Sequence, residues 1–587
     1  MTKSSKPTNE QLSVVGAGGH LLVRACPGAG KTRTMVALGE RAAATGGARS
    51  GVAFLSFTNA AVDELNQRLC DTATNRGMTR APHYTGTFDA FLIKYVLGPD
   101  GHSHAPGIRV QFRDHWGGHP IRFKAGKTTM SVPLDVFLPN GRTVRLDKNR
   151  APHGAYALRA FLERLDQQER ERLCEIGNQE VRRRLKAGIL TSPFLRSEAR
   201  KRLGRDRANA HLAARFHTVI VDEAQDCDAV DLEILDALKT AGCRCVVVAD
   251  PEQAIFRWRD ADPARLSLLG FPEMRLTGNF RSSDTICRAA ATLRSVESEP
   301  DTALGPAAMV QNPVIVVPFS TDDLDSGKVL AEFTQALERA GIDTKSAAIV
   351  AHREAHAGRV LGIRDDIRAS ESFAAVLARG SSSSASSADR TAAVQRLQET
   401  LASAFDPAAR QDPNLKGWIH HTARQVMGEL AGQHISLSGV CKSTRKILAG
   451  ISAPPGQSFI KEPAKCFTAK GRGAVTPSSN SPGPLMRYST VHAVKGREYD
   501  AVLVVVGDTS YLDELVDAWR ARDPAHEGRA VLYVAATRAR RLLVFAVPAR
   551  VCDAVAELLR RQGAPVQVAS GARETEFVLR WSALETA

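Results

Sequence analysis

The stretch ACPGAGKT, residues 25–32, decides the fold of this chain. It follows a short apolar run, Leu21–Val23, and precedes a helix-like segment, Thr34–Leu38. A glycine-rich turn between a strand and a helix directs several backbone N–H groups to one point, where the helix N-terminus adds partial positive charge. Lys31 can then reach the β- and γ-phosphates of a nucleotide, and the hydroxyl of Thr32 can bind Mg²⁺. The stretch therefore predicts a nucleoside triphosphate cradle, whose residues are Pro27, Gly28, Ala29, Gly30, Lys31 and Thr32.

A second segment supplies the acidic groups that phosphate hydrolysis needs. The apolar run Val219–Val221 has the pattern of a short buried strand, and it ends in the sequence DEAQD, residues 222–226. An acid at the tip of a strand beside a phosphate cradle can give Mg²⁺ its second protein contact, which suits Asp222. The next carboxylate, Glu223, is placed to orient and deprotonate an attacking water. A polar loop after a strand is the alternative interpretation, and the pairing with residues 25–32 favours the hydrolytic site.

Length and charge indicate several domains and a polyanionic partner. The chain has 587 residues, which suggests about three to five domains or subdomains. Its 78 Lys and Arg residues outnumber 63 Asp and Glu residues, and the net charge of +15 favours nucleic acid as a partner. The 191 residues between Lys31 and Asp222 exceed what one nucleotide-binding sheet requires, so a segment is inserted. This segment, about residues 90–207, is rich in Arg and Lys; a nucleic-acid platform and a solvated charged face both remain open.

Cysteine usage and hydropathy indicate a cytoplasmic protein. The ten cysteines are scattered, and only Cys243 and Cys245 are close together, in an apolar strand-like run. This pattern favours reduced, mostly buried thiols over a disulfide framework or a metal cluster. The N-terminus lacks the apolar core of a secretory signal, and no apolar run approaches the length of a membrane span, so no membrane partner is expected.

Three segments combine aromatic, amide and basic residues in a way that a simple ATPase does not need. They are Ser56–Ala61, Gly86–Asp89 and Ala249–Arg259, and the first and third follow strand-like runs. Aromatic rings on loops can stack on unpaired bases, at roughly 1–3 kcal/mol per base. Thr and Asn side chains nearby, including Thr87, would hold phosphates without reading sequence. Burial in the core is the alternative for each aromatic residue, and their position on loops favours the nucleic-acid role.

Four further segments complete a recognisable order of motifs. They are PTNEQ at residues 7–11, NFRS at 279–282, TVHAVKGREYD at 490–500 and LYVAATRAR at 532–540. Together with the cradle and the DEAQD segment, this order resembles superfamily 1 DNA helicases of the UvrD/Rep/PcrA type. The resemblance implies an α/β fold of two RecA-like P-loop domains with parallel sheets, each carrying a mostly helical inserted subdomain.

The resemblance also implies roles for individual residues, with ATP and Mg²⁺ as cofactors. At the ATP site they are Gln11 for the adenine edge, Arg33 and Phe280 for its two faces, Gln253 for the γ-phosphate, Glu498 for the ribose, and Arg281 and Arg538 as arginine fingers from the second domain. Single-stranded DNA would be gripped by Phe57, Thr58, Asn59, Phe256, Trp258, Arg259 and His492. An arginine finger from across a domain cleft ties transition-state stabilisation, worth about 10³–10⁵ in rate, to closure of that cleft.

The domain organisation follows from the position of the motifs. We expect the first RecA-like domain (1A) at residues 1–89 and 208–285, the basic insertion (1B) at 90–207, the second RecA-like domain (2A) at 286–362 and 485–587, and a short 2B-like insertion at 363–484. Two Ser- and Pro-rich stretches, residues 380–387 and 476–484, have the composition of flexible linkers. Only 37 residues follow Arg550, fewer than an appended nuclease domain needs, so the chain is not expected to cut DNA itself.

Two functions are compatible with these motifs. The leading interpretation is an ATP-dependent 3′→5′ DNA helicase and translocase, which couples hydrolysis between its two RecA-like domains to movement on single-stranded or tailed duplex DNA, as in DNA repair. The alternative is a DNA-activated ATPase subunit that senses DNA ends and regulates a separate OLD-family nuclease, similar to the helicase component of Gabija-type antiphage systems. An RNA-directed motor is a third possibility. Departures from the family pattern at Asp89, Ala249 and Pro251–Glu252 concern the coupling of ATP to DNA rather than hydrolysis itself.

Overall fold

The computed structural model describes most of the chain and divides it into two compact units. Unit 1 comprises residues 1–360 and 486–587, and unit 2 comprises residues 361–485. The described residues are 6–46, 49–70, 76–98, 101–102, 104–116, 120–151, 155–203, 206–255, 261–320, 323–324, 327–361, 376–377, 380–381, 387–406, 409, 412–431, 437–466 and 486–569. Within these ranges, no helix combines the length and the apolar character of a membrane span.

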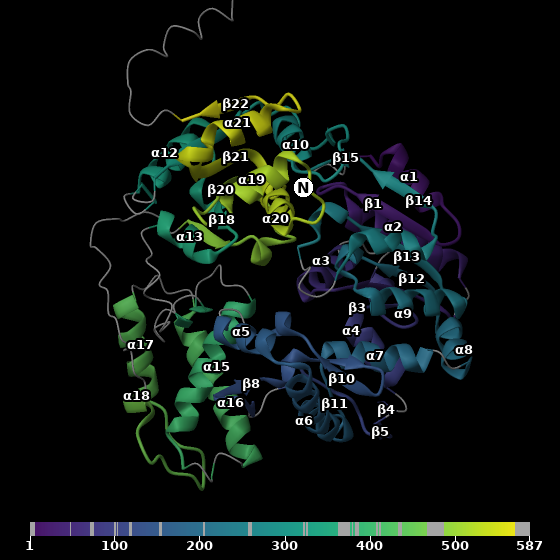
Figure 1. Cartoon of the computed structure of the whole chain (residues 1–587), viewed down its shortest axis with the longest axis vertical. Helices are drawn as coiled ribbons and strands as arrows, with labels where there is room; N and C mark the ends of the chain where they lie inside the picture. The colour runs from purple at the N-terminus through teal and green to yellow at the C-terminus, as the bar shows by residue number, and fades with distance from the viewer. Residues whose placement is uncertain are drawn as a thin grey trace, which may run out of the picture. The chain divides into compact units, whose positions relative to one another are not determined.

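Six parallel strands form the first sheet of unit 1, in the order β14-β1-β13-β12-β2-β3 (Figure 1). Their bounds are Leu21–Ala25 (β1), Gly51–Ser56 (β2), Tyr84–Thr87 (β3), Phe216–Val221 (β12), Arg244–Ala249 (β13) and Glu273–Leu276 (β14). Alternate strand residues enter two separate apolar cores: Leu22 lies in one, and Leu21 and Val23 lie in the other. Because both faces are covered, the strands need nearly continuous apolar runs, which explains the pattern in the sequence.

Four helices accompany the first sheet: α1 (Asn9–Gly16) precedes β1, whereas α2 (Lys31–Thr45), α3 (Asn59–Cys70) and α9 (Ala229–Thr240) follow β1, β2 and β12. Helix α1 begins with a capping box, in which the Thr8 hydroxyl accepts from the Gln11 N–H and the Gln11 amide oxygen accepts from the Thr8 N–H. Since the carboxyl ends of parallel strands meet at one edge, the loops after Ala25, Val221 and Ala249 converge there.

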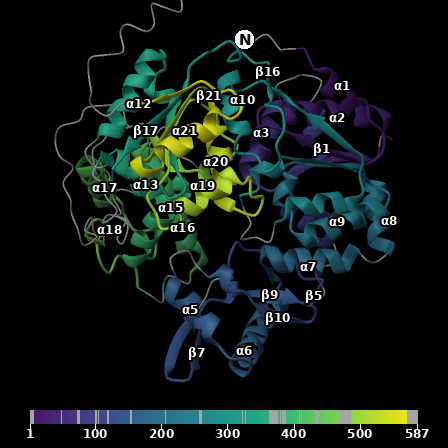
Figure 2. The ribbon, with the colours of Figure 1, turned by 45° about the horizontal axis from the view of Figure 1, so that its top comes forward.

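The chain between β3 and β12 forms the first insertion. Its helices are α4 (Phe88–Phe91), α5 (Tyr156–Arg164), α6 (Gln167–Lys186), α7 (Ser192–Leu203) and α8 (Asp206–Arg215). Short strands add three antiparallel pairs, β4 (Gly101–His102) with β5 (Ala105–Pro106), β7 (Ile121–Ala125) with β8 (Thr128–Val132) and β9 (Phe137–Asn140) with β10 (Thr143–Leu146), and one parallel pair, β6 (Gln111–Phe112) with β11 (Ile189–Leu190). Strands β9 and β10 lie between α6 and α7 (Figure 2).

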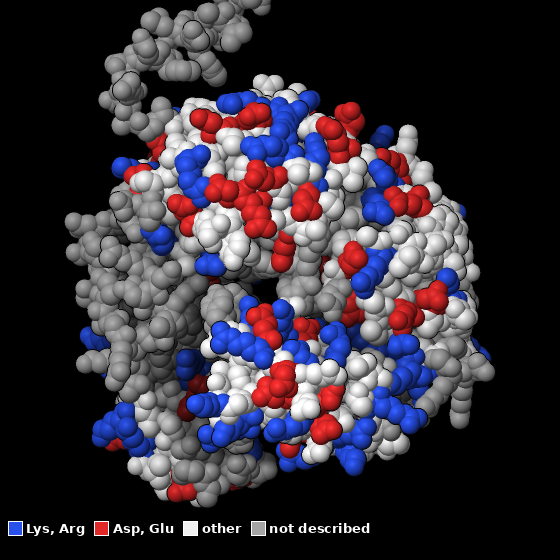
Figure 3. Space-filling model, in the orientation of Figure 1, with Lys and Arg blue, Asp and Glu red and all other residues white. Residues whose placement is uncertain are grey.

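Lys and Arg side chains are numerous on the surface of this insertion, over α6 and α7 on the face drawn in Figure 3. Arg182, Arg183 and Lys186 at the end of α6 are exposed. Arg196 on α7 belongs to the same basic run in the sequence but is buried, between Asp89 at 3.2 Å and Asp231 at 3.0 Å. The insertion therefore directs part of its positive charge inward, where Arg196 joins α7 to α4 and to α9 of the first sheet.

The second sheet of unit 1 also has six parallel strands, in the order β19-β18-β20-β21-β17-β22. Their bounds are Val314–Phe319 (β17), Ala347–Ala351 (β18), Arg487–Thr490 (β19), Tyr499–Val505 (β20), Ala539–Pro548 (β21) and Val566–Val568 (β22). The helices of this part are α10 (Asp284–Ala291), α12 (Lys328–Arg339), α13 (Glu354–Val360), α19 (Leu512–Arg520), α20 (Glu527–Ala536) and α21 (Cys552–Arg560). A short parallel pair, β15 (Gly278–Asn279) and β16 (Thr302–Ala303), lies in the segment that connects the two sheets. The expected α/β class with two parallel sheets is confirmed.

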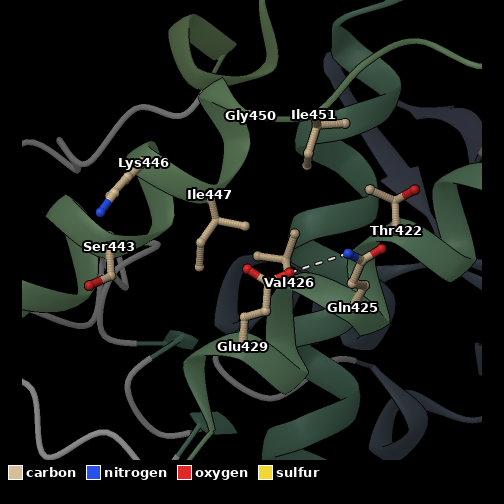
Figure 4. Close-up of a pocket in the computed structure, with 9 residues that line it drawn as sticks. All are labelled: Thr422, Gln425, Val426, Glu429, Ser443, Lys446, Ile447, Gly450 and Ile451. Carbon is tan, nitrogen blue, oxygen red and sulfur yellow. Dashed lines mark hydrogen bonds between the residues drawn. The ribbon is translucent and has the colours of Figure 1, made fainter.

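Unit 2 is helical in its described part and has an apolar core of its own. Its helices are α15 (Ser387–Ser403), α16 (Pro413–Leu430), α17 (Leu437–Ala449) and α18 (Pro463–Cys466). The core includes Leu397, Phe405 and Val426, all buried. A groove of about 500 Å³ between α16 and α17 (Figure 4) is lined by Thr422, Gln425, Val426, Glu429, Ser443, Lys446, Ile447, Gly450 and Ile451. The four-part division into 1A, 1B, 2A and 2B stays a prediction.

Candidate active site

The phosphate cradle lies between β1 and α2, as the sequence requires. Gly28 and Gly30 have φ of 78° and 73°, in the left-handed region that favours glycine. Gly30 is the N-cap of α2, so Lys31 and Thr32 open the helix and lie half-buried at its N-terminus. The free N–H groups of a first helical turn, together with the helix dipole, favour an anion at this point.

Gly28 is also required because another loop approaches it closely. The Gly28 carbonyl accepts from the Phe280 N–H at 2.8 Å. A Cβ atom on Gly28 would stand 2.6 Å from the Cβ of Arg281 and 2.6 Å from the side-chain oxygen of Asn279. The cradle is thus backed by the loop of residues 279–281, which carries two of the predicted ATP-site residues.

We expect Gly28→Ala to destabilise the protein and weaken nucleotide binding, whereas Gly19→Ala should affect stability alone. Gly19 also has a left-handed φ, 70°, but a Cβ there meets nothing within 4 Å. Both variants incur the backbone cost, about 1–2 kcal/mol, and overlap with residues 279 and 281 adds about 1–3 kcal/mol to Gly28→Ala alone. Denaturant unfolding and titration with a fluorescent nucleotide would measure the two effects. Equal losses in both variants would show that the close approach has no role.

Gln11, predicted to contact adenine, lies directly behind the cradle. Its side-chain amide donates to the Ala29 carbonyl at 2.9 Å, and its amide oxygen accepts from the Thr8 N–H at 3.1 Å. A Gln side chain has two donor hydrogens and two acceptor lone pairs, so one of each remains after these two bonds. Arg33 lies on the first turn of α2, and the Phe280 ring reaches 4.0 Å from the position of a Cβ on Gly30. The adenine role of these three residues stays a prediction.

The two acidic residues of the DEAQD segment lie at the end of β12. The Glu223 N–H donates to a carboxylate oxygen of Asp222 at 2.9 Å, and the Gln225 amide donates to Glu223. Glu223 has a φ of 55°, one of two described non-glycine residues with a left-handed backbone. Such a conformation costs of order 1 kcal/mol and persists where the surroundings fix it, which is common at functional sites.

The electrostatics of this pair differ between the two carboxylates. Burial, followed by the charge of Glu223, raises the pKa of Asp222 to about 7. Burial would also raise the pKa of Glu223, but the charges of Lys31 and Lys495 outweigh it and lower that pKa. Lys31 is a counter-charge to Asp222 but does not offset its burial and the charge of Glu223, whereas Glu223 is held as the anion.

The donor chemistry at this edge fits Mg²⁺. A divalent cation beside Asp222 would add positive charge to that of Lys31, and carboxylate and hydroxyl oxygens are ligands that Mg²⁺ prefers. Mg²⁺ keeps several waters and is usually bound through one or two carboxylates plus substrate phosphates. The described residues contain no group of three or more His, Cys, Asp or Glu side chains that could hold a metal ion. Thr32 and Asp222 are the residues that would hold the ion.

The turn after β13 connects the two sheets. Asp250, whose pKa burial raises to about 6, accepts from the Gln253 amide at 2.7 Å. The Gln253 oxygen accepts from the guanidinium of Arg538 at 3.0 Å. Arg538 follows helix α20 of the second sheet, is 1% exposed, and also donates to the carbonyl of Val534. The structure therefore brings the predicted γ-phosphate sensor and one predicted arginine finger into direct contact.

The second predicted finger, Arg281, contacts the predicted ribose carboxylate. Its guanidinium donates to Glu498 at 2.9 Å and to the carbonyl of Thr537 at 3.0 Å. Glu498 also accepts from Arg540 at 2.7 Å. Burial acts to raise the pKa of Glu498, but Arg281 and Arg540 outweigh it and hold that pKa at about 2. Arg281 and Glu498 form an ion pair, and their roles toward a nucleotide stay predictions.

The predicted DNA-contacting residues occupy several loops. Phe57 is half-buried, and its ring stacks on the buried ring of Phe88 with 5.2 Å between the ring centroids. The Arg196 guanidinium lies 5.8 Å from the centroid of the Phe57 ring. Thr58 and Asn59 are exposed at the start of α3, and the hydroxyl of Thr87 caps α4 by accepting from the Ala90 N–H.

On the second sheet, the Nε2 atom of His492 lies 3.1 Å from the carbonyl oxygen of Ile255. The remaining three predicted contacts, Phe256, Trp258 and Arg259, lie outside the described residues. Of the expected set, five residues can therefore be placed, and four of these belong to the first sheet and the start of its insertion.

Sequence reasoning missed several residues that hold these groups. The Lys495 ammonium lies 2.7 Å from a carboxylate oxygen of Asp226, and the Arg529 guanidinium lies 2.9 Å from Glu252. Glu252 also accepts from the N–H of Ser295. Lys495 and Asp226 both lie inside the recognised motifs, so the sequence identified them as residues near the site. The sequence did not show which Lys or Arg side chain pairs with which carboxylate.

The glycine-rich turn after β1 and the two parallel sheets are the features of a P-loop protein. Residues 7–102 and 154–270 match the family model of the UvrD/REP helicase N-terminal domain. Over these residues the chain is similar to the UvrD-like group of superfamily 1 helicases.

Three curated relatives show the extent of the similarity. RecBCD enzyme subunit RecB of Borreliella burgdorferi is 41% identical over 69 residues, 12% of this chain and 5% of that protein. ATP-dependent DNA helicase Rep of Escherichia coli is 39% identical over 84 residues, 14% of this chain and 12% of that protein. Gabija protein GajB of Bacillus cereus is 22% identical over 350 residues, 58% of each protein. The matched regions thus span less than two thirds of each relative.

Proposed function

We propose that this protein is an ATP-dependent DNA helicase and translocase that moves 3′→5′ on single-stranded DNA. The observation that carries the proposal is the bond between Arg538 and Gln253, because it joins the second sheet to the turn after β13 of the first. A γ-phosphate that contacts both side chains would make the junction between the sheets depend on the state of the nucleotide. The match to the UvrD/REP helicase family model and the similarity to the DNA helicase Rep support both the ATPase and the DNA partner.

The ATPase step follows from the chemistry of the site. Lys31 and the N–H groups at the start of α2 bind the phosphates, and Thr32 and Asp222 would hold Mg²⁺, which neutralises charge on the phosphate oxygens. Glu223, held as an anion, accepts the proton of the attacking water. Arg538 and Arg281 donate to the oxygens on which negative charge develops.

Movement on DNA requires that the two sheets change their separation during this cycle. Phe57, Thr58 and Asn59 follow β2 of the first sheet, whereas His492 follows β19 of the second. A strand held at both places would be drawn along when the junction closes on ATP and released when it opens. The phosphate contacts among these residues read no sequence, so the motor would act on any single strand.

A second candidate function rests on the similarity to Gabija protein GajB, which extends over 350 residues, 58% of this chain. In that case the chain is a DNA-activated ATPase that senses DNA ends and regulates a separate OLD-family nuclease. Its ATP cycle would be the same, and its output would be a change in the partner rather than strand separation.

The deciding experiment measures ATP hydrolysis and strand separation side by side. The protein is assayed without nucleic acid, with single-stranded DNA, with duplexes carrying a 3′ or a 5′ tail, and with RNA. We expect single-stranded DNA to raise turnover by about tenfold or more, a coupling of ordinary size, and only the 3′-tailed duplex to be unwound. The 5′-tailed duplex is the matched control for polarity.

Each other outcome has a distinct meaning. Stimulation by single-stranded DNA without unwinding of either duplex would favour the nuclease-regulating ATPase. Unwinding of the 5′-tailed duplex alone would contradict the proposed polarity. Stimulation by RNA and not by DNA would contradict both functions.

A further inference from the structure

A single turn of the second sheet reaches two parts of the ATP site. The 3₁₀ turn His492–Val494 follows β19, and Lys495 comes directly after it. The Lys495 ammonium lies 2.7 and 3.0 Å from the two carboxylate oxygens of Asp226, and it donates to the Gln253 carbonyl at 3.1 Å. The Lys495 side chain is 9% exposed and that of Asp226 only 1%, so water contributes little to this contact.

Asp226 transmits this contact to the carboxylate that activates water. It ends the short turn that begins after Glu223, and its N–H donates to the Glu223 carbonyl at 3.0 Å. The Lys495 ammonium itself stands 3.9 Å from a carboxylate oxygen of Glu223. Since Glu223 has a left-handed backbone that its surroundings must maintain, a shift of Lys495 would change the position of the Glu223 side chain.

The same turn also holds the γ-phosphate sensor. Lys495 binds the carbonyl of Gln253, and His492 lies 3.1 Å from the carbonyl oxygen of Ile255. The Ile255 side chain is fully buried in the apolar core of the second sheet. The stretch Gln253–Ile255 leaves the first sheet, yet the second sheet fixes both of its ends. Residues 256–259, which follow it, include three of the predicted DNA contacts.

We propose that Lys495 is a positioning residue that couples DNA contact at His492 to the alignment of Glu223 and Gln253. This inference rests on the proposed function, since it names the part that transmits the DNA signal to hydrolysis. When a DNA strand displaces His492, the turn moves, and Lys495 carries the movement to both parts of the ATP site. Stability alone is a weak reason for such a buried ion pair, because an apolar pair of similar volume is often equally stable.

The test compares variants that remove this link with one that leaves it. Lys495→Met alone would leave the Asp226 charge buried and unpaired, which is strongly destabilising, so the decisive variant is Lys495→Met with Asp226→Asn. Arg497→Ala is the matched control, because Arg497 is an exposed cation two residues along the same loop. Thermal unfolding first establishes that the variants are folded.

The readout is the ratio of kcat with saturating oligo(dT) to kcat without DNA, together with KM for ATP. We expect this ratio to fall about tenfold in the double variant, a typical size for coupling between sites, while KM changes by less than about threefold. Arg497→Ala should keep the wild-type ratio. An unchanged ratio in the folded double variant would overturn the inference alone. A wild-type protein that DNA does not stimulate would overturn both the inference and the proposed function.

Discussion

Lys31→Ala is expected to reduce ATP turnover by about 10³-fold or more, beyond the loss from removing a single transition-state donor. Lys31 opens α2 at the cradle, and its charge lowers the pKa values of Asp222, Glu223 and Asp250, so it lies close to all three acids. Without it, the phosphates would meet these carboxylates with no cation from the cradle between them. Steady-state hydrolysis in the presence of single-stranded DNA measures the effect.

The control for this prediction is Arg41→Ala. Arg41 is an exposed cation in the C-terminal half of the same helix, about three helical turns after Lys31. We expect Arg41→Ala to retain wild-type turnover and both variants to show the wild-type circular dichroism spectrum. If folded Lys31→Ala retained more than about a tenth of the wild-type hydrolysis rate, far more activity than a 10³-fold loss would leave, the assigned role of the cradle would be refuted.

Glu223→Gln should retain nucleotide binding and lose about 10²–10⁴ in turnover, the range for removing a general base. Glutamine has nearly the same shape, so the left-handed backbone and the neighbouring Gln225 contact are disturbed little compared with the loss of basicity. Single-turnover hydrolysis and fluorescent-nucleotide binding would separate the two effects. Weakened nucleotide binding with an unchanged hydrolysis rate would show that Glu223 is a binding group instead.

Asp222→Asn provides the contrast to this variant. If Asp222 holds Mg²⁺, removing its charge should raise the Mg²⁺ concentration needed for half-maximal turnover, because the metal loses its protein carboxylate. Glu223→Gln should leave that Mg²⁺ requirement near the wild-type value. A change in the Mg²⁺ requirement therefore identifies the metal ligand, and a loss of turnover at an unchanged Mg²⁺ requirement identifies the general base.

Much of the fold could be predicted because strand and loop signals are local. The runs Leu21–Val23 and Val219–Val221 are buried on both faces, and their lack of polar residues correctly predicted buried strands. The loops that follow these strands carry the cradle and the acids, and parallel strands bring such loops to one edge whatever their separation in sequence. The hairpins of the first insertion escaped notice since their strands have only two to five residues.

The contacts between the sheets could not be predicted in this way. Nothing local states that Lys495 pairs with Asp226 or that Arg529 pairs with Glu252, because each pair joins residues about 270 positions apart. The resemblance placed ATP roles on residues one at a time, whereas the structure shows that Gln253 and Arg538 contact each other directly. These are properties of how two domains meet.

Phe57 illustrates a second limit of sequence reasoning. An aromatic residue on a loop after a strand has the composition of a base-stacking platform. In the structure one face of the ring is occupied by Phe88, and Arg196 of the insertion lies within cation–π distance of it. The sequence could not show this, because Arg196 reads as one member of a solvated basic run. Its burial with Asp89 and Asp231 appears only when the insertion is folded.

The strand order of the first sheet has a consequence for folding of the protein during its synthesis on the ribosome. Central strand β1 pairs with β13 and β14, and 225 residues separate Leu21 from its partner Val246. At a synthesis rate of about 5–20 residues per second, roughly 10–45 s pass between the synthesis of β1 and that of β13, the first of these partners. During that interval its apolar side chains and unpaired backbone resemble an open sheet edge, the feature that chaperones and aggregation both recognise. The insertion that enlarges the molecule therefore also lengthens the period in which its nascent chain needs protection.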